Sequence, residues 1–209
     1  MRLPTHDEAL GLFEKYQVPS NILAHCKKVC EVGTFLAAAL KKKGTVVNVE
    51  LVSRACLLHD LMKAVVFEDI SKPIPSLKFY PTPHQIAMHA ELRKKYAGMH
   101  EDAIAYELLH TRYPELAAII RGTKEKNGEH DTSRMPIEEK IKWYSDWRVF
   151  VDQIVTLDER AAEAYERKKK KISDIPRWTR EIGKAKAVEQ ELFAHLDFPA
   201  EKLKQQVDS

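Results

Sequence analysis

The sequence predicts an all-α fold, and two observations support this prediction. The chain of 209 residues contains only seven glycines, and the long alternating runs of β-branched residues that are typical of strands are scarce. In several segments apolar residues instead recur every three to four positions, which is the spacing of one buried helix face. With 44% hydrophobic and 31% charged residues, the chain has the composition of a globular protein that is long enough for a substantial core.

Charge, cysteines and the start of the chain indicate the compartment and the partners. The net charge of +3 is too small to indicate nucleic-acid binding by itself. Three cysteines do not make a disulfide framework in a chain of this size, which favours a reducing compartment. The segment from Met1 to Asp7 lacks the apolar core of a signal peptide, and no apolar run approaches the roughly 20 residues of a membrane span. We therefore expect a cytoplasmic protein without a membrane partner.

Local sequence signals mark the beginnings of the first three helices. Thr5 and Glu8 form the pattern of a capping box, which opens a helix expected to run to about Tyr16. A second helix is expected to begin at residues 19–21 and to end at residues 41–44, where three lysines and a glycine suit a helix C-terminus. Asn48 is the expected N-cap of a third helix. The buried face of the second helix, next to His25, consists of Ile22, Cys26, Val29, Gly33, Leu36 and Leu40.

The third helix carries an adjacent histidine and aspartate, His59 and Asp60. His59 shares one side of the helix with apolar residues and is expected to point inward, with Asp60 about 100° round the helix from it. Burying an imidazole beside a carboxylate is unfavourable unless a partner compensates them. A divalent cation would do so, with imidazole nitrogen and carboxylate oxygen as ligands. The alternative is that His25 and His59 are core histidines with satisfied hydrogen bonds.

Prolines interrupt the chain after this helix. Between residues 64 and 83, four prolines exclude a long helix, and the segment is either a lid or substrate loop or a surface excursion. Residues 122–136 are expected to form a polar loop, and Pro176 is expected to break the chain. Further helices are expected at about residues 84–95, from His100, at 114–120, from Pro136 and at 179–196.

One more carboxylate, Asp146, lies among apolar residues on the helix after Pro136 and completes the ordered set His25, His59, Asp60 and Asp146. With LLHDLMK at residues 57–63 and KIKWYSDWRV at residues 140–149, this order resembles the HD-domain metal-dependent phosphohydrolases. The resemblance covers about residues 20–160. It implies an all-helical HD-domain bundle in which the four residues bind a divalent metal. The alternative for Asp146 is an acceptor of an N–H hydrogen bond.

The resemblance also implies the number of metal ions. A set of two histidines and two aspartates accommodates Mn, Fe, Co, Ni, Zn or, less readily, Mg. His100 begins a segment similar to the additional His-Glu segment of HD proteins with two metals. Residues 119–127 lack the further histidine pair that such proteins carry, and His130 is displaced from that position. We therefore expect one metal ion, with His100 near the substrate; the alternative for His100 is an exposed histidine at a helix start.

The expected activity is hydrolysis of a small phosphate monoester or diester, most readily of a nucleotide. The metal would lower the pKa of bound water and polarise the phosphoryl group. Asp60 could act as the base for that water, and Lys63 could offset negative charge on the phosphate. Lys63 and Arg148 are candidate substrate-binding residues, although Lys63 could also be a solvated lysine at a helix end.

The composition changes after residue 157. We expect an HD-type phosphohydrolase domain at residues 1–157 and a charged helical extension at 158–209, packed on the domain or appended to it. Lys168–Lys171, together with Trp178 and Arg180, could bind nucleic acid, although a lysine run on a charged helix is usually a solvated face. Another alternative is a non-catalytic HD module that binds a metal, a nucleotide or a protein partner.

Overall fold

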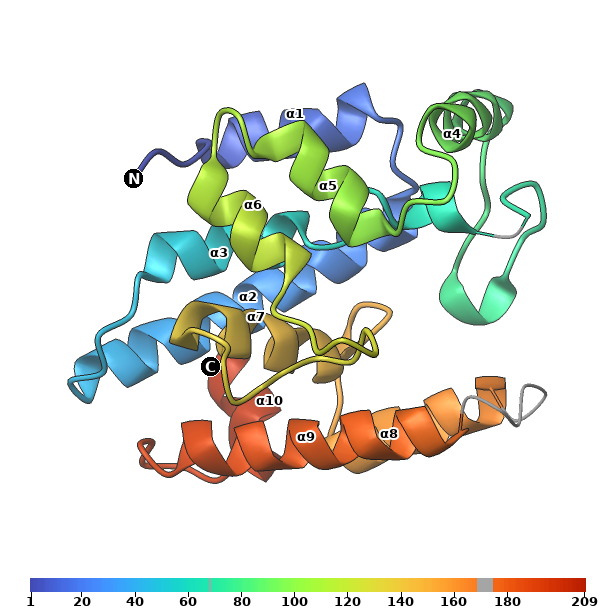
Figure 1. The fold of residues 1–209 in the computed structure, drawn as a ribbon. Helices are drawn as coiled ribbons and strands as arrows, with labels where there is room; N and C mark the ends of the chain where they lie inside the picture. Colours follow the sequence, from blue (N-terminus) through green and yellow to red (C-terminus); the bar gives the residue numbers. More distant parts are fainter. Residues whose placement is uncertain (68, 169–174) are drawn as a thin grey trace.

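A computed structural model describes residues 1–67, 69–168 and 175–209 of the chain (Figure 1). The all-α prediction is confirmed, because almost all regular structure in these residues is helical. Two short strands, β1 (Val149–Phe150) and β2 (Gln153–Ile154), form an antiparallel hairpin. The 3-10 helices are η1 (Lys63–Val66), η2 (Pro75–Leu77) and η4 (Ala200–Lys202). The α-helices are α1 (His6–Lys15), α2 (Ser20–Lys42), α3 (Val49–Leu58), α4 (Pro83–Lys95), α5 (Glu101–Leu109), α6 (Pro114–Arg121), α7 (Ile137–Trp147), α8 (Leu157–Lys168), α9 (Ile175–Phe193) and α10 (Leu203–Val207).

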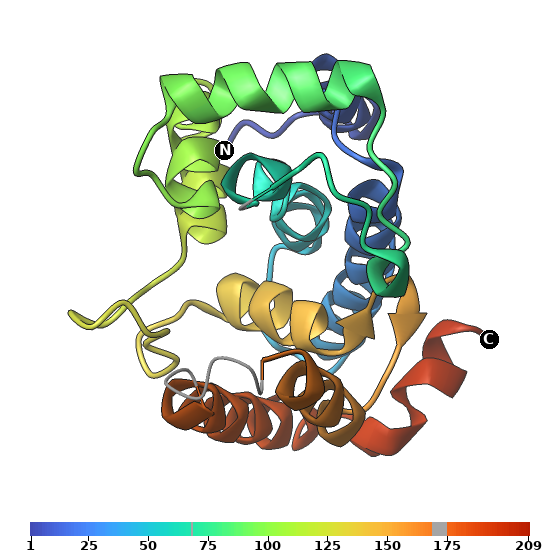
Figure 2. The same ribbon diagram turned by 90° about the vertical axis from the view of Figure 1, so that its right-hand side faces the viewer.

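Helix α2 runs through the middle of the molecule and contributes to both parts of the hydrophobic core. One part joins the first half of α2 to α1, α3, α5 and α6 and includes Phe13, Leu58 and Leu116. The other joins the second half of α2 to α7, α9 and α10 and includes Leu36 and Leu192. Helix α7 therefore lies between α2 and α3 on one side and α9 on the other (Figure 2).

Two of the predicted helix starts, at Thr5 and Asn48, are confirmed by capping hydrogen bonds, whereas α2 begins after Pro19 without a side-chain cap. The amide of Glu8 donates to Thr5 Oγ1 at 3.1 Å, and the amide of Thr5 donates to the Glu8 carboxylate at 2.8 Å. The amide of Leu51 donates to Asn48 Oδ1 at 3.0 Å, so Asn48 caps α3. These contacts satisfy amides that a helix start otherwise leaves without partners.

Three local features differ from the sequence predictions. Helix α3 ends at Leu58, so Asp60 lies in a turn beyond it rather than on a continuing helix. The prediction that Pro176 breaks the chain was wrong, because Pro176 lies in the first turn of α9, where proline is tolerated. The β1–β2 hairpin was not predicted, because two-residue strands carry almost no periodic signal.

The C-terminal residues pack on the rest of the chain. Helix α9 lies along α7 and shares the core with it. The division at residue 157 stays a prediction, and the lysines at 169–171 lie outside the described residues. No helix in the described part of the chain has the length and apolar character needed to cross a membrane.

Candidate metal centre

Three neighbouring segments bring the predicted metal ligands together. His25 lies on α2, His59 and Asp60 follow the last residue of α3, and Asp146 lies on α7. The Nε2 atom of His25 lies 2.9 Å from Asp146 Oδ1, and Nε2 of His59 lies 3.4 Å from the same oxygen and 3.7 Å from Asp60 Oδ2. One possible ligand atom from each of His25, His59 and Asp60 lies within 4.8 Å of the other two. Three segments whose ligands are 34 to 121 positions apart in the chain thus form one compact cluster.

Both imidazole rings are fixed through their Nδ1 atoms. Nδ1 of His25 lies 2.9 Å from the carbonyl oxygen of Val151, and Nδ1 of His59 lies 2.8 Å from that of Cys56. A carbonyl can only accept a hydrogen bond, so each Nδ1 carries the proton and donates. In the neutral ring each Nε2 then presents a lone pair to the carboxylates, which is the arrangement of histidines that bind metals.

The carbonyl that fixes His25 depends on an unusual backbone conformation. Val151 lies in the turn between β1 and β2 and has a φ of +55°. This left-handed conformation is rare for a β-branched residue and is unfavourable unless the surroundings enforce it. The hydrogen bond from His25 is one such contact, so the short hairpin orients a ligand of the cluster.

The cluster fits a metal ion. Within the described residues the buried Nε2 atom of His59 makes no hydrogen bond, although two carboxylate oxygens lie nearby. A nitrogen lone pair facing carboxylate oxygens is repulsive unless a proton or a cation lies between them. The donor set of two imidazoles and two carboxylates is one that divalent transition metals accept. These residues could therefore hold a divalent cation.

The closeness of imidazoles and carboxylates in the cluster also shifts their pKa values. Burial lowers the pKa of His59, but Asp60, Cys26 and Asp146 together outweigh burial and hold the pKa well above its usual value. Removal from water raises the pKa of Asp146, but His25 and His59, whose Nε2 atoms lie 2.9 and 3.4 Å from its Oδ1 atom, outweigh it and hold the pKa well below its usual range. The cluster thus attracts positive charge, either as a proton on His59 or as a metal ion.

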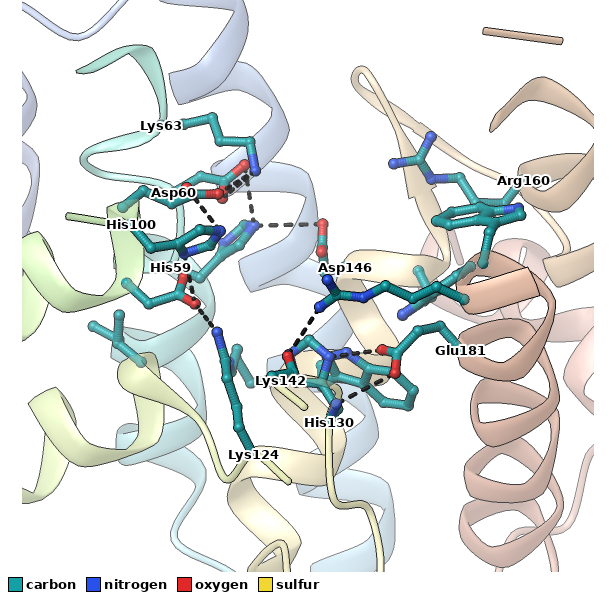
Figure 3. A pocket seen from close by; sticks show the side chains of 18 residues that line it. His59, Asp60, Lys63, His100, Lys124, His130, Lys142, Asp146, Arg160 and Glu181 are labelled. Carbon is teal, nitrogen blue, oxygen red and sulfur yellow. Dashed lines mark hydrogen bonds and ion pairs between the residues drawn. The ribbon is translucent and has the colours of Figure 1, made fainter. Parts of the chain in front are cut away.

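The cluster opens into a cavity of about 440 Å³ (Figure 3). His59, Asp60 and Asp146 line one end of the cavity, whereas His25 lies behind Asp146. Trp143, Trp147 and Trp178 also line the cavity, with Trp147 and Trp178 stacked at a centroid distance of 4.7 Å. A polar cavity with an aromatic wall beside a possible metal centre is a typical small-molecule site.

A second polar group, formed by His100, Glu101 and Asp102, begins α5 and lines the same cavity. Each carboxylate is paired with a lysine: Lys63 Nζ lies 2.6 Å from Glu101 Oε1, and Lys124 Nζ lies 2.5 Å from Asp102 Oδ2. The ring nitrogens of His100 lie 3.1 Å from Glu101 and from Asp102. This group could hold a cation by geometry alone, but the two ammonium groups already balance its charge.

The ion pairs shift the pKa values of this second group. The carboxylate of Asp60, followed by that of Glu101, raises the pKa of Lys63 above its usual range, so the ammonium stays charged. Removal from water raises the pKa of Asp102, but hydrogen bonds from His100 and Lys124 outweigh it and lower the pKa far below the usual value. The hydrogen bond to Asp102 likewise raises the pKa of His100.

The structure corrects one predicted substrate residue. Arg148 does not line this cavity, and its side chain is only 2% exposed. Its guanidinium donates to Tyr144 Oη, to the Glu189 carboxylate at 2.9 Å and to the carbonyls of Val155 and Ala200. The prediction was wrong because the periodicity identifies a buried face but not the element that covers it. Arg148 therefore joins α7 to the C-terminal segment.

Several lining residues were not predicted as site residues. Lys124 and His130 come from the polar loop after α6, and Nδ1 of His130 lies 2.7 Å from the Glu181 carboxylate of α9. Only tertiary structure brings them to the cavity. Lys142, however, precedes Asp146 by four residues on one helix, and this spacing could have identified it from the sequence.

Two of the residues named for nucleic-acid binding, Trp178 and Arg180, have partners within the chain. Trp178 stacks on Trp147, and Arg180 Nη2 lies 2.5 Å from the Glu129 carboxylate.

No curated protein and no solved structure matches the chain. A family model for the HD domain matches residues 22–196, which include all four residues of the cluster and the whole of α9. The chain therefore belongs to the HD-domain family.

Proposed function

We propose that the protein is a divalent-metal-dependent phosphohydrolase that acts on a small phosphate ester. The observation that carries this proposal is the cluster of two Nε2 lone pairs and two carboxylates at one end of a polar cavity. Membership of the HD-domain family supports it, because members of this family are generally metal-dependent hydrolases.

His25, His59, Asp60 and Asp146 would hold one divalent ion. Such an ion activates water and polarises a phosphoryl group when it is bound. The fixed Nδ1 protons keep both histidines in the tautomer that binds metal. The carbonyls of Cys56 and Val151 thus preorganise the site from behind.

Asp60 and Lys63 are the proposed catalytic residues. Asp60 Oδ2 faces His59 and Asp60 Oδ1 lies 3.9 Å from Lys63 Nζ, so this carboxylate lies between the cluster and a permanent positive charge. Asp60 would orient and deprotonate the attacking water. The ammonium of Lys63, held by Glu101, would stabilise charge on the phosphoryl oxygens. His100, at the cavity edge, would contact the substrate.

A nucleotide is the substrate that we favour. Trp143, Trp147 and Trp178 line the cavity that also holds the cluster, and indole rings provide flat apolar surface for a base. A phosphate at the cluster and a base near the indoles would fill both chemical environments of the cavity.

The experiment is a screen of phosphomonoesters and phosphodiesters, nucleotides included, with metal-stripped protein to which each divalent metal is restored. We expect hydrolysis only with a metal, and loss of both metal content and turnover in Asp60→Ala. Asp158→Asn is the matched control, because Asp158 is 82% exposed on α8 and lies outside the cavity. Full activity in Asp60→Ala would refute the proposal.

A non-catalytic module that binds a metal and a nucleotide is the second candidate. The observation in its favour is that Lys63 and Lys124 are already engaged by carboxylates. Metal-loaded protein that binds nucleotides and hydrolyses none of the esters would support this candidate over the first.

A further inference from the structure

Lys142 is a nearly buried lysine in the cavity, and its charge has no partner among the residues that the structure describes. Its side chain is 6% exposed, and the residue lines the cavity one helical turn before Asp146 (Figure 3). Across residues 1–67, 69–168 and 175–209, the ammonium of Lys142 makes neither a hydrogen bond nor an ion pair, and it is not fully enclosed by protein, so it opens onto the cavity. Lys63 and Lys124, the two other lysines of the cavity, are each paired with a carboxylate.

A nearly buried ammonium without a counter-charge is unfavourable, because it loses most of its hydration and gains no ion pair in return. Lysines are almost never buried in this way unless something compensates them. Asp146 is on the same helix, but its carboxylate faces His25 and His59. The cavity is therefore the place where a compensating group can bind.

The charge balance of the cavity indicates what that group is. Its described lining holds five carboxylates and five lysine or arginine side chains, which formally cancel (5 − 5 = 0). A divalent ion in the cluster, as the proposed function requires, would leave a charge of +2. A phosphate monoester carries about −1.5 to −2 near neutral pH and would restore the balance.

We propose that Lys142 is a substrate-binding residue whose ammonium anchors a phosphoryl group beside the His25–His59–Asp60–Asp146 cluster. The choice of a phosphoryl group rests on the proposed function, whereas the need for an anion rests on Lys142 itself. Side chains four residues apart lie on one helix face. Helix α7 therefore carries both a ligand of the cluster and the anchor for the anion. A lysine offers three donors around a compact charge, which suits a phosphate.

The test compares Lys142→Met with Lys140→Met. Lys140 lies on the same helix but pairs with Glu191 at 2.7 Å and is absent from the cavity lining. The measurements are the affinity for inorganic phosphate by calorimetry, with and without Mn²⁺, and the midpoint of urea unfolding. We expect Lys142→Met to weaken phosphate binding about 10- to 100-fold, the effect of losing a charged hydrogen bond. Lys140→Met should change the affinity by less than about twofold.

Stability provides the readout that separates an anchor from a structural lysine. Removing an uncompensated buried charge should leave the midpoint of Lys142→Met equal to or above that of the parent protein. Added phosphate should raise the midpoint of the parent protein but not of this variant. If Lys142→Met does not fold, Lys142→Gln, which keeps a polar end group, takes its place in the same measurements.

The outcomes distinguish this proposal from the proposed function. Undiminished phosphate affinity in the Lys142 variant would overturn the anchor, whether or not esters are hydrolysed. If the parent protein hydrolyses no ester but Lys142→Met still loses phosphate binding, the anchor stands and the proposed function fails. If hydrolysis occurs and both its KM and the phosphate affinity are unchanged in Lys142→Met, the function stands and the anchor fails.

Discussion

Replacing Gly33 with alanine tests whether close packing of three helices positions the cluster. Gly33 lies on α2 where it meets α3 and α7, the elements that lead to the other ligands. An added Cβ atom would lie 2.4 Å from Cys56 Sγ and 3.2 Å from Ser145 Oγ. Favourable contacts between such atoms are at about 3.5–4.0 Å, so α2 has to move by roughly 1 Å or its neighbours have to repack.

The expected change in the free energy of unfolding of Gly33→Ala is the sum of two opposing contributions. Overpacking a well-filled core destabilises by about 1–3 kcal/mol, whereas alanine gains up to about 1 kcal/mol over glycine in a helix. We therefore expect Gly33→Ala to lower the free energy of unfolding by about 1–2 kcal/mol. The shift of α2 should also displace His25 and weaken metal binding.

The assay is urea unfolding together with metal titration, and Gly183→Ala is the control. Gly183 is an exposed helical glycine with nothing within 4 Å of an added Cβ atom. This control should gain up to about 1 kcal/mol, the opposite sign. Adding Cys56→Ala to Gly33→Ala removes the closest clash and should show favourable coupling in a double-mutant cycle. Equal stabilisation by Gly33→Ala and Gly183→Ala would refute the packing argument.

Three further predictions concern different parts of the molecule. Arg148→Met should lower the free energy of unfolding by about 3–5 kcal/mol, because it leaves Tyr144 and Glu189 without their cation. The metal content should not change, and an unaltered urea midpoint would contradict this prediction. A divalent metal at about 100 times its Kd should raise the free energy of unfolding by about 2.7 kcal/mol, or Tm by about 5–10 °C. His59→Ala should remove that shift, and its persistence would exclude the cluster as the binding site. The lowered pKa of Asp102 means that its contribution to stability is present above the ordinary value of 3.8 and is lost as pH falls through the folded-state pKa. Asp102→Asn should therefore flatten the acid limb of stability against pH below about 4, and a slope equal to that of the parent protein would argue against the Asp102–Lys124 pair.

Helix starts could be predicted from the sequence because they depend on residues three positions apart. Thr5 with Glu8, and Asn48 with Leu51, make the expected capping hydrogen bonds. Pro176 shows the limit of such rules, because proline suits both a break and the first turn of a helix. The chain continues into α9 because the packing of α9 against α7 stabilises the helix.

The four residues of the cluster could be selected because their residue types and order are unusual for buried helix faces. The remaining cavity residues depend on distant contacts: His130 needs Glu181 of α9, and Lys124 needs Asp102 of α5. Arg148 was predicted to bind the substrate because the periodicity places it on a buried helix face without showing which element covers that face. The sequence therefore indicates the chemistry of the cluster, whereas the shape and charge of the cavity follow from tertiary structure.

The most direct test of the central claim is one titration of metal-stripped protein with Mn²⁺, in which bound metal and ester hydrolysis are measured together. We expect both signals to saturate at one ion per chain and both to be lost in His25→Ala. In the parent protein, His25 Nε2 lies 2.9 Å from the Asp146 carboxylate. Hydrolysis that proceeds without bound metal, or metal binding and turnover that are unchanged in His25→Ala, would contradict the claim that this cluster is the catalytic metal centre.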